Sequence, residues 1–113
     1  MHQNSTSFHL LAECANGYIG ECTCCREFNF AYKNILLAFQ EEEMCRFLEW
    51  LVDSRYHPDT FQPLPHQRDR VYCSPLSNMY LAFSLEELEE VEALFGQARL
   101  MLEARKIISD SAS

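Results

Sequence analysis

Hydrophobic and polar residues alternate along EFNFAY, residues 27–32, which is the period of a strand with one buried face. A two-residue turn at 33–34 and the apolar run ILLAF, residues 35–39, predict a second strand returning beside the first. The acidic run at 41–43 then opens a segment with apolar spacings of three and four, which predicts a helix with a buried stripe. The members of that stripe are Met44, Phe47, Leu48 and Leu51.

The second half of the chain shows the same order of patterns. Residues 71–74 and 79–83 predict two strands joined by a turn at 75–78. Ser84 is a good N-cap, and Glu87 three places on completes a capping box for a second, longer helix. The apolar stripe of this helix consists of Leu88, Val91, Phe95, Ala98 and Leu102, widened by Leu94 and Met101.

A shift of 44 positions relates the two halves. Asn34 corresponds to Asn78 and Leu37 to Leu81, and an identical Ala-Phe pair follows each leucine. This match predicts a structural duplication, and the alternative is that two strand-to-helix junctions share one binary pattern. The expected repeats cover about 28–54 and 72–106, with a proline-containing loop at 55–69 between them.

Together these patterns predict a single α+β domain over residues 1–113. We expect two β-β-α units whose strands form a mostly antiparallel sheet covered by the two helices. The N-terminal segment is expected to add a strand or a knuckle-like arm.

Composition and charge narrow the class of protein. The chain is 48% hydrophobic and 23% charged, the balance of a globular domain, and its net charge of -8 argues against nucleic-acid binding. No apolar run is long enough to span a membrane, and the first residues lack the basic and apolar regions of a secretory signal. We therefore expect a cytoplasmic protein that binds neither nucleic acid nor membrane.

Three of the six cysteines lie in the four positions Cys22-Thr-Cys-Cys25. The pair Cys22 and Cys25 has the spacing of a zinc knuckle, in which a tight turn directs two thiolates at one ion. A strand is expected on each side of the pair, as in a zinc ribbon. A thioredoxin-type redox centre is disfavoured, because its Cys-x-x-Cys opens a helix. The alternative is a group of free thiols.

A structural zinc needs four ligands, and the pair supplies two. The nearest further cysteine is Cys14, and one histidine would complete the site. Cys24 could replace Cys22 or Cys25, although adjacent side chains seldom both reach one ion. The predicted zinc ligands are Cys22, Cys25, Cys14 and His66, and the other candidates are His9, Cys73 and Asp69.

These features favour a non-enzymatic binding or adaptor module stabilised by a structural metal. The alternative is a metal-thiolate enzyme, or a metal or redox sensor, that uses the cysteine cluster. The surplus apolar width of the second helix predicts a homodimer through that helix.

The chain resembles a family of short bacterial proteins of unknown function, found mainly in Bacteroidota, in its segments GYIGECTCCREFNFAYKNILLAF and RVYCSPLSNMYLAFSLEELEEVEALF. The matching positions, within about residues 17–105, are Cys22, Cys25, Asn34, Asn78, Leu81 and Phe83. The resemblance implies a stand-alone cytoplasmic domain, and it brings no activity, substrate or catalytic residues.

Overall fold

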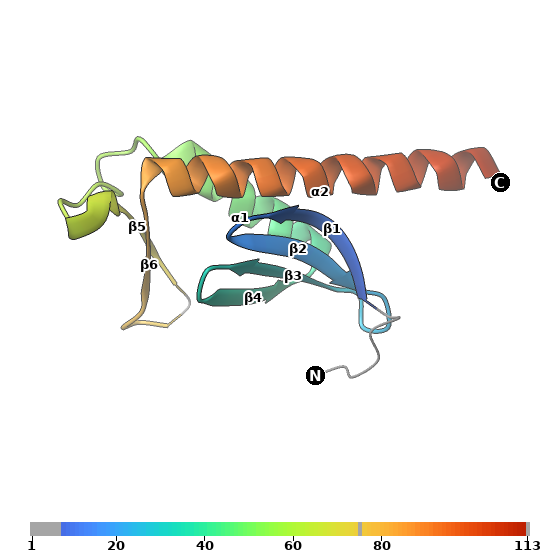
Figure 1. Cartoon of the computed structure of the whole chain (residues 1–113), viewed down its shortest axis with the longest axis horizontal. Helices are drawn as coiled ribbons and strands as arrows, with labels where there is room; N and C mark the ends of the chain where they lie inside the picture. The colour runs from blue at the N-terminus through green and yellow to red at the C-terminus, as the bar shows by residue number, and fades with distance from the viewer. Residues whose placement is uncertain (1–7, 75, 113) are drawn as a thin grey trace. The chain divides into compact units, whose positions relative to one another are not determined.

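The computed structural model describes residues 8–74 and 76–112 (Figure 1). The elements, in chain order, are β1 (Phe8–Cys14), β2 (Gly17–Cys22), β3 (Glu27–Tyr32), β4 (Ile35–Phe39), α1 (Glu41–Ser54), the 3-10 turn η2 (Pro65–Gln67), β5 (Arg70–Cys73), β6 (Tyr80–Phe83) and α2 (Leu85–Ala112). No helix within the described ranges is both long and apolar enough to cross a membrane.

The predicted α+β class is confirmed, and one detail of the sheet is corrected. β1 to β4 form an antiparallel sheet in sequence order, whereas β5 and β6 form a separate two-stranded sheet. The N-terminal segment supplies a full strand, β1, which pairs with β2. The expected turn at 75–78 includes Pro75, which lies outside the described residues.

The chain divides into two compact units. The first contains the described residues up to Met44 and those from Ala93 onwards, and the second is Cys45–Glu92. The boundary falls inside α1 and inside α2, so each unit contains part of both helices.

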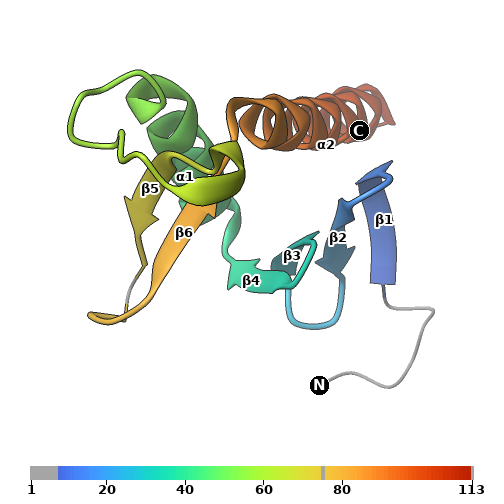
Figure 2. The same ribbon diagram turned by 60° about the vertical axis from the view of Figure 1, so that its left-hand side comes forward.

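The core of the first unit lies between the buried face of β3 and α2. Phe30 is fully buried, lies opposite Ile19 of β2, and has its ring 5.1 Å from that of Phe95. Each such side chain stabilises the fold by roughly 1.5–3 kcal/mol through removal of apolar surface from water. The part of α2 that begins at Ala93 accordingly packs against the four-stranded sheet, and Figure 2 shows the helix on one side of the strands.

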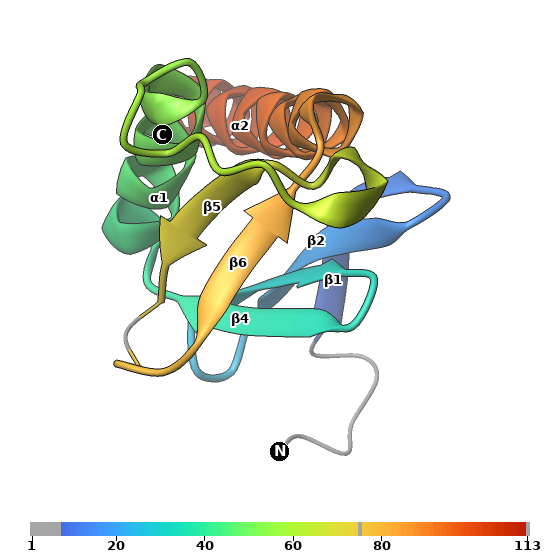
Figure 3. The same ribbon diagram turned by 90° about the vertical axis from the view of Figure 1, so that its left-hand side faces the viewer.

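The core of the second unit is aromatic. Tyr72 of β5 pairs with Leu81 of β6, and both are buried. The Tyr72 ring lies 4.9 Å from Trp50 and 6.2 Å from Phe83. Figure 3 shows β5 and β6 side by side. These contacts bury the apolar face of a sheet that is too small to be stable alone.

Both helices begin with the same hydrogen bond, 44 positions apart. The Gln40 backbone N–H donates to Glu43 Oε1 at 2.8 Å, and the Ser84 backbone N–H donates to Glu87 Oε1 at 2.8 Å. Only the second helix has the reciprocal bond, from Glu87 N–H to Ser84 Oγ at 3.1 Å, because glutamine replaces the N-cap serine at the first. The strand pairing differs, however: Phe39 pairs with Phe28, whereas Phe83 pairs with Arg70 instead of the equivalent Tyr72. The duplication stays a prediction.

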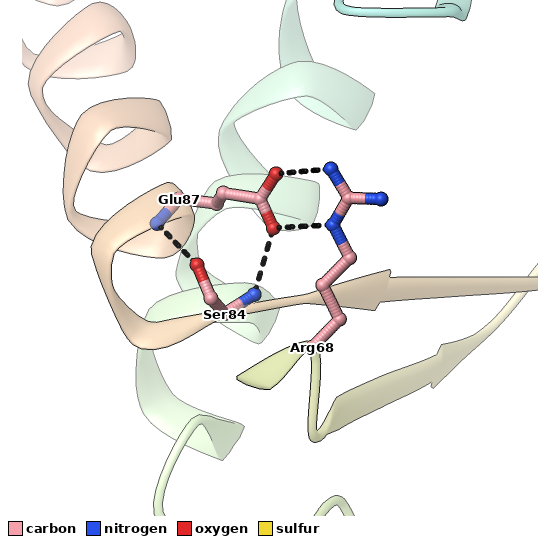
Figure 4. A network of polar contacts seen from close by, with 3 residues as sticks. All are labelled: Arg68, Ser84 and Glu87. Carbon is pink, nitrogen blue, oxygen red and sulfur yellow. Dashed lines mark hydrogen bonds and ion pairs between the residues drawn. The ribbon is translucent and has the colours of Figure 1, made fainter. Parts of the chain in front are cut away.

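The 55–69 loop is attached to the start of α2. Arg68 donates two hydrogen bonds to Glu87, from Nε at 3.2 Å and from Nη2 at 3.1 Å (Figure 4). A second attachment is a bridge between Phe61 and Arg70. The buried carboxylate of Glu87 thus serves the helix cap and the loop together.

The environment of the Tyr72 hydroxyl predicts that the stability of the second unit depends on pH. It donates a 2.7 Å hydrogen bond to the backbone oxygen of Leu51, one of the last four carbonyls of α1, which lack a partner within the helix. Burial raises the pKa of Tyr72 to about 12, against the opposing influence of Arg55 and Arg70. Because this folded-state pKa lies above the usual value near 10, the stabilisation is complete below about pH 10 and is lost between about pH 10 and 12. The loss amounts to about 2–3 kcal/mol.

Replacing Tyr72 by phenylalanine should remove this dependence. We expect Tyr72→Phe to lower the free energy of unfolding by about 1 kcal/mol at pH 7, because the Leu51 oxygen loses its donor. Urea unfolding at pH 8 and pH 11 then gives a larger decrease for the wild type than for the variant. An equal decrease in both proteins would show that the Tyr72 hydroxyl does not cause it.

Candidate metal centre

The cysteine cluster lies where β2 turns into β3: Cys22 ends β2, and Cys24 and Cys25 lie in the turn, residues 23–26. Cys22, the last residue of β2, pairs with Glu27, the first residue of β3. Within the turn the Arg26 backbone N–H donates to the Cys22 carbonyl oxygen at 2.8 Å, and Arg26 has a φ of 59°. This left-handed residue lets a single helix-like turn rejoin the strand. The turn therefore gathers side chains that an extended chain would place on opposite faces.

The three cysteine sulfurs converge. The Sγ atoms of Cys22, Cys24 and Cys25 all lie within 4.8 Å of one another, and the Cys22–Cys24 separation is 3.4 Å. Zinc–sulfur bonds of about 2.3 Å in a tetrahedron place two sulfurs about 3.8 Å apart. The 3.4 Å separation is slightly shorter than that value and none of the three exceeds 4.8 Å, so small side-chain rotations would bring the three thiolates around one ion.

The turn also favours one thiolate before any ion binds. The pKa of Cys22 is lowered, chiefly by the hydrogen bond from the Cys25 thiol and also by the backbone N–H groups of Cys24 and Cys25, while burial opposes the shift. The pKa of Cys25 is raised, chiefly because its proton is shared with Cys22. The thiolate and its nearest proton donor are thus next to each other, and a metal ion would displace that proton.

The cluster is buried on one side and open on the other. Cys22 is buried, whereas Cys24 and Cys25 are exposed. The Cys25 thiol lies 3.9 Å from Glu27 Oε1, which brings a carboxylate oxygen beside the exposed sulfurs. This donor set, three soft sulfurs and one oxygen, suits zinc and other thiophilic ions better than calcium or magnesium.

A hollow of about 500 Å³ borders the same turn. Thr23 and Arg26 of the turn line it, together with Glu21 and Arg105, whose Oε1 and Nη1 atoms are 2.7 Å apart. The hollow places paired charges beside the cysteine turn.

Within the first unit, the structure places Cys14 and His9 away from the cysteine cluster. Cys14 pairs with Gly17, so it lies at the far end of β2 from Cys22, about 16 Å along the strand. The hairpin register thus separates Cys14 from the cluster. His9 pairs with Glu21, next to the Phe8–Cys22 pair, and strand alternation directs it to the opposite face.

His66 and the remaining candidates belong to the second unit. His66 lies on η2, Cys73 is exposed in β5, and Asp69 forms an ion pair with Arg70. Among the described residues, the group that could hold a metal ion consists of the three turn cysteines. The inclusion of His66 in a ligand set stays a prediction.

Sequence reasoning gave too little weight to Cys24. The rule that adjacent side chains diverge holds in a strand, but Cys24 and Cys25 occupy a turn whose backbone is helix-like. The signal in the sequence was the density itself, three cysteines in four positions. The four-ligand rule for structural zinc directed attention to distant residues instead.

Comparison with known proteins gives a family and no activity. No curated protein and no solved structure matches the chain. Residues 3–109 match a family of unknown function, DUF6686, and the match covers the cysteine turn, both sheets and nearly all of α2. The chain therefore belongs to the DUF6686 family.

Proposed function

We propose that the protein is a small, non-enzymatic binding module in which Cys22, Cys24 and Cys25 hold one zinc ion. The observation that carries the proposal is the convergence of the three sulfurs within 4.8 Å of one another. The lowered pKa of Cys22 supports it, because a metal ligand must be a thiolate. Exposed apolar side chains on α2, including Leu100 and Ile108, support the binding role.

The ion would stabilise the β2–β3 turn. The three thiolates come from four consecutive positions, so binding one ion fixes the turn and with it the end of the strand pair. Because the unfolded chain has no preformed site, the free energy of metal binding adds to the free energy of folding. The fourth ligand would be the Glu27 carboxylate or a water molecule.

A second candidate function is a metal sensor, or a metal-thiolate enzyme. The exposure of Cys24 and Cys25 favours it, because structural zinc sites are usually closed, whereas an exposed site can keep one coordination position open. The cytoplasmic location and the bacterial occurrence are further predictions, from the sequence and the resemblance.

The test is metal content. Protein purified without a histidine tag is expected to contain about one zinc per chain, measured by inductively coupled plasma mass spectrometry. Each of Cys22→Ser, Cys24→Ser and Cys25→Ser should lower zinc affinity by at least about 100-fold, because a thiolate is lost from the ion. The matched controls Cys73→Ser and Cys14→Ser should retain the metal.

Cobalt substitution separates the two candidate functions. A closed site keeps the visible spectrum of bound cobalt unchanged when a small thiol or imidazole is added, whereas an open site changes its spectrum. His66→Ala in the same assay tests the predicted histidine ligand. Absence of zinc from the wild type, together with equal metal uptake by wild type and Cys22→Ser, would refute the metal centre.

A further inference from the structure

The part of α2 that belongs to the first unit, from Ala93 onwards, has two apolar faces. One is buried within the first unit, where Leu94, Phe95 and Ala98 are at most 2% exposed and Phe95 contacts Phe30. The other consists of large side chains in solvent, with exposed fractions of 68% for Leu100, 48% for Met101, 66% for Ile107 and 68% for Ile108. A helix that only covered a sheet would be polar on this second face.

These exposed residues form one continuous surface. A helix turns about 100° per residue, so positions 100, 101, 104, 107 and 108 lie within an arc of about 120° whose centre, Ala104, is about 120° from Ala98. The sheet side of the helix lies between Arg105, which is paired with Glu21 at 2.7 Å, and Lys106, which is paired with Glu41 at 3.3 Å. We call the arc centred on Ala104 the outer face; its members are Leu100, Met101, Ala104, Ile107 and Ile108, and Ile108, near its edge, also lines a hollow with Glu21, Glu41 and Arg105.

The outer face is large enough to form a protein–protein interface. Its four large side chains, each about half to two-thirds exposed, present on the order of 500 Å² of apolar surface, at the upper end of what monomers usually expose. Two such faces in contact would bury on the order of 1,000 Å², the lower limit for a specific interface. A partner of this face must itself present a narrow apolar surface, because all five members of the face are apolar and none can hydrogen-bond to a polar side chain.

We propose that the partner is a second copy of this chain, bound through the outer face in a parallel, two-fold symmetric helix pair. The charged residues at the two edges of the outer face favour this partner and this orientation. Glu103 lies about 100° to one side of the centre of the outer face and Arg105 about 100° to the other. In a parallel two-fold pair each edge meets the opposite edge of the partner, so Glu103 of each copy faces the partner's Arg105. The small residue Ala104 lies at the centre and permits close approach of the helices.

Arg105 can pair with the partner's Glu103 in addition to its own Glu21. Its side chain is 47% exposed although it is paired with Glu21, and Glu103 is exposed. Bidentate geometry and several N–H donors allow one guanidinium to bind two carboxylates. The inference does not depend on the metal centre, since none of these residues belongs to the cysteine turn.

Analytical ultracentrifugation of the full chain over roughly 1–200 µM tests the pair, and an interface of this size predicts a micromolar Kd. The double variant Leu100→Glu/Ile107→Glu should weaken association at least about 50-fold, because each copy would carry two charges into the apolar contact. Glu103→Arg should weaken it about tenfold, since an arginine would then face Arg105. Circular dichroism and zinc content should be unchanged in both variants.

The matched control is Leu36→Glu, which alters a 63% exposed leucine of β4 outside the outer face and should leave the Kd unchanged. A wild type that is monomeric at 200 µM, or a double variant with an unchanged Kd, would overturn the proposal and leave another protein or a lipid surface as the occupant. An unchanged Kd in Glu103→Arg would overturn the parallel arrangement. Repeating the series with a chelator distinguishes loss of the metal centre from loss of the dimer.

Discussion

Gly17→Ala is expected to disrupt the four-stranded sheet and to lower the free energy of unfolding by at least about 3 kcal/mol. Gly17 is the first residue of β2 and pairs with Tyr32 of β3. A Cβ atom at this position would overlap the backbone oxygen of Ala31 and lie 2.9 Å from Tyr32 Cα. Both obstacles are main-chain atoms, so the strands would have to separate.

The expected loss is large relative to the stability of a domain, which is usually about 5–15 kcal/mol. It also reaches the cysteine turn, because β2 and β3 frame that turn through the Cys22–Glu27 pair. We therefore expect Gly17→Ala to lower both the midpoint of urea unfolding and the affinity for zinc. A variant with wild-type stability would show that β2 and β3 are farther apart at Gly17 than the structure has them.

Gly20→Ala is the matched control in the same strand. The added Cβ atom would meet the ring of Phe8, a side chain that is 38% exposed and can rotate into solvent. We expect a loss below about 1 kcal/mol, through weakened contact between Phe8 and the sheet. The comparison of the two alanine variants separates a clash with main chain from a clash with a mobile ring.

The parts of the fold that sequence predicted are those in which one local pattern decides the structure. β4, residues 35–39, and the capped start of α2 at Ser84 agree with the structure because a short apolar run and a capping box are local signals. The N-terminal strand β1 was expected only as a strand or an arm, since its register with β2 carries an irregularity between Leu10 and Ala12 that breaks the alternation.

The separation of β5 and β6 from the main sheet was not predictable in the same way. Both sheets are antiparallel, and the binary pattern of a strand does not say which edge it joins.

The cysteine site was also predictable from the sequence only in part. The spacing of Cys22 and Cys25 indicated a turn, but the third sulfur, Cys24, depended on the conformation of four turn residues and on the left-handed φ of Arg26.

The outer face of α2 was also visible in the sequence only in part. Met101 was assigned to the buried stripe because it widens the run at Leu94 and Leu102. The structure instead leaves it 48% exposed. Apolar width alone therefore indicated a second contact without locating it.

Glu87→Ala is expected to lower the free energy of unfolding of the second unit by about 2–3 kcal/mol, which corresponds to a decrease in Tm of about 10 °C. Its carboxylate accepts hydrogen bonds from the Ser84 N–H and twice from Arg68, and its side chain is only 11% exposed. The alanine variant loses the helix cap, worth about 1 kcal/mol, and also leaves the Arg68 guanidinium without its carboxylate partner. Because Arg68 is half exposed, water replaces part of that second loss.

Two further variants divide the effect between cap and loop. Glu87→Gln keeps an oxygen for the Ser84 N–H but removes the charge, so we expect about half the loss, assigned to Arg68. Glu89→Ala, on the exposed side of the same helix turn, should change stability by less than about 0.5 kcal/mol, because alanine and glutamate have similar helix propensities. Hydrogen exchange of residues 60–69 should rise in Glu87→Ala and stay unchanged in Glu89→Ala, since Glu87 is what fixes the loop to the helix. If the loop amides exchange equally in both variants, Arg68 and Glu87 do not hold it, and the stability loss belongs to the cap alone.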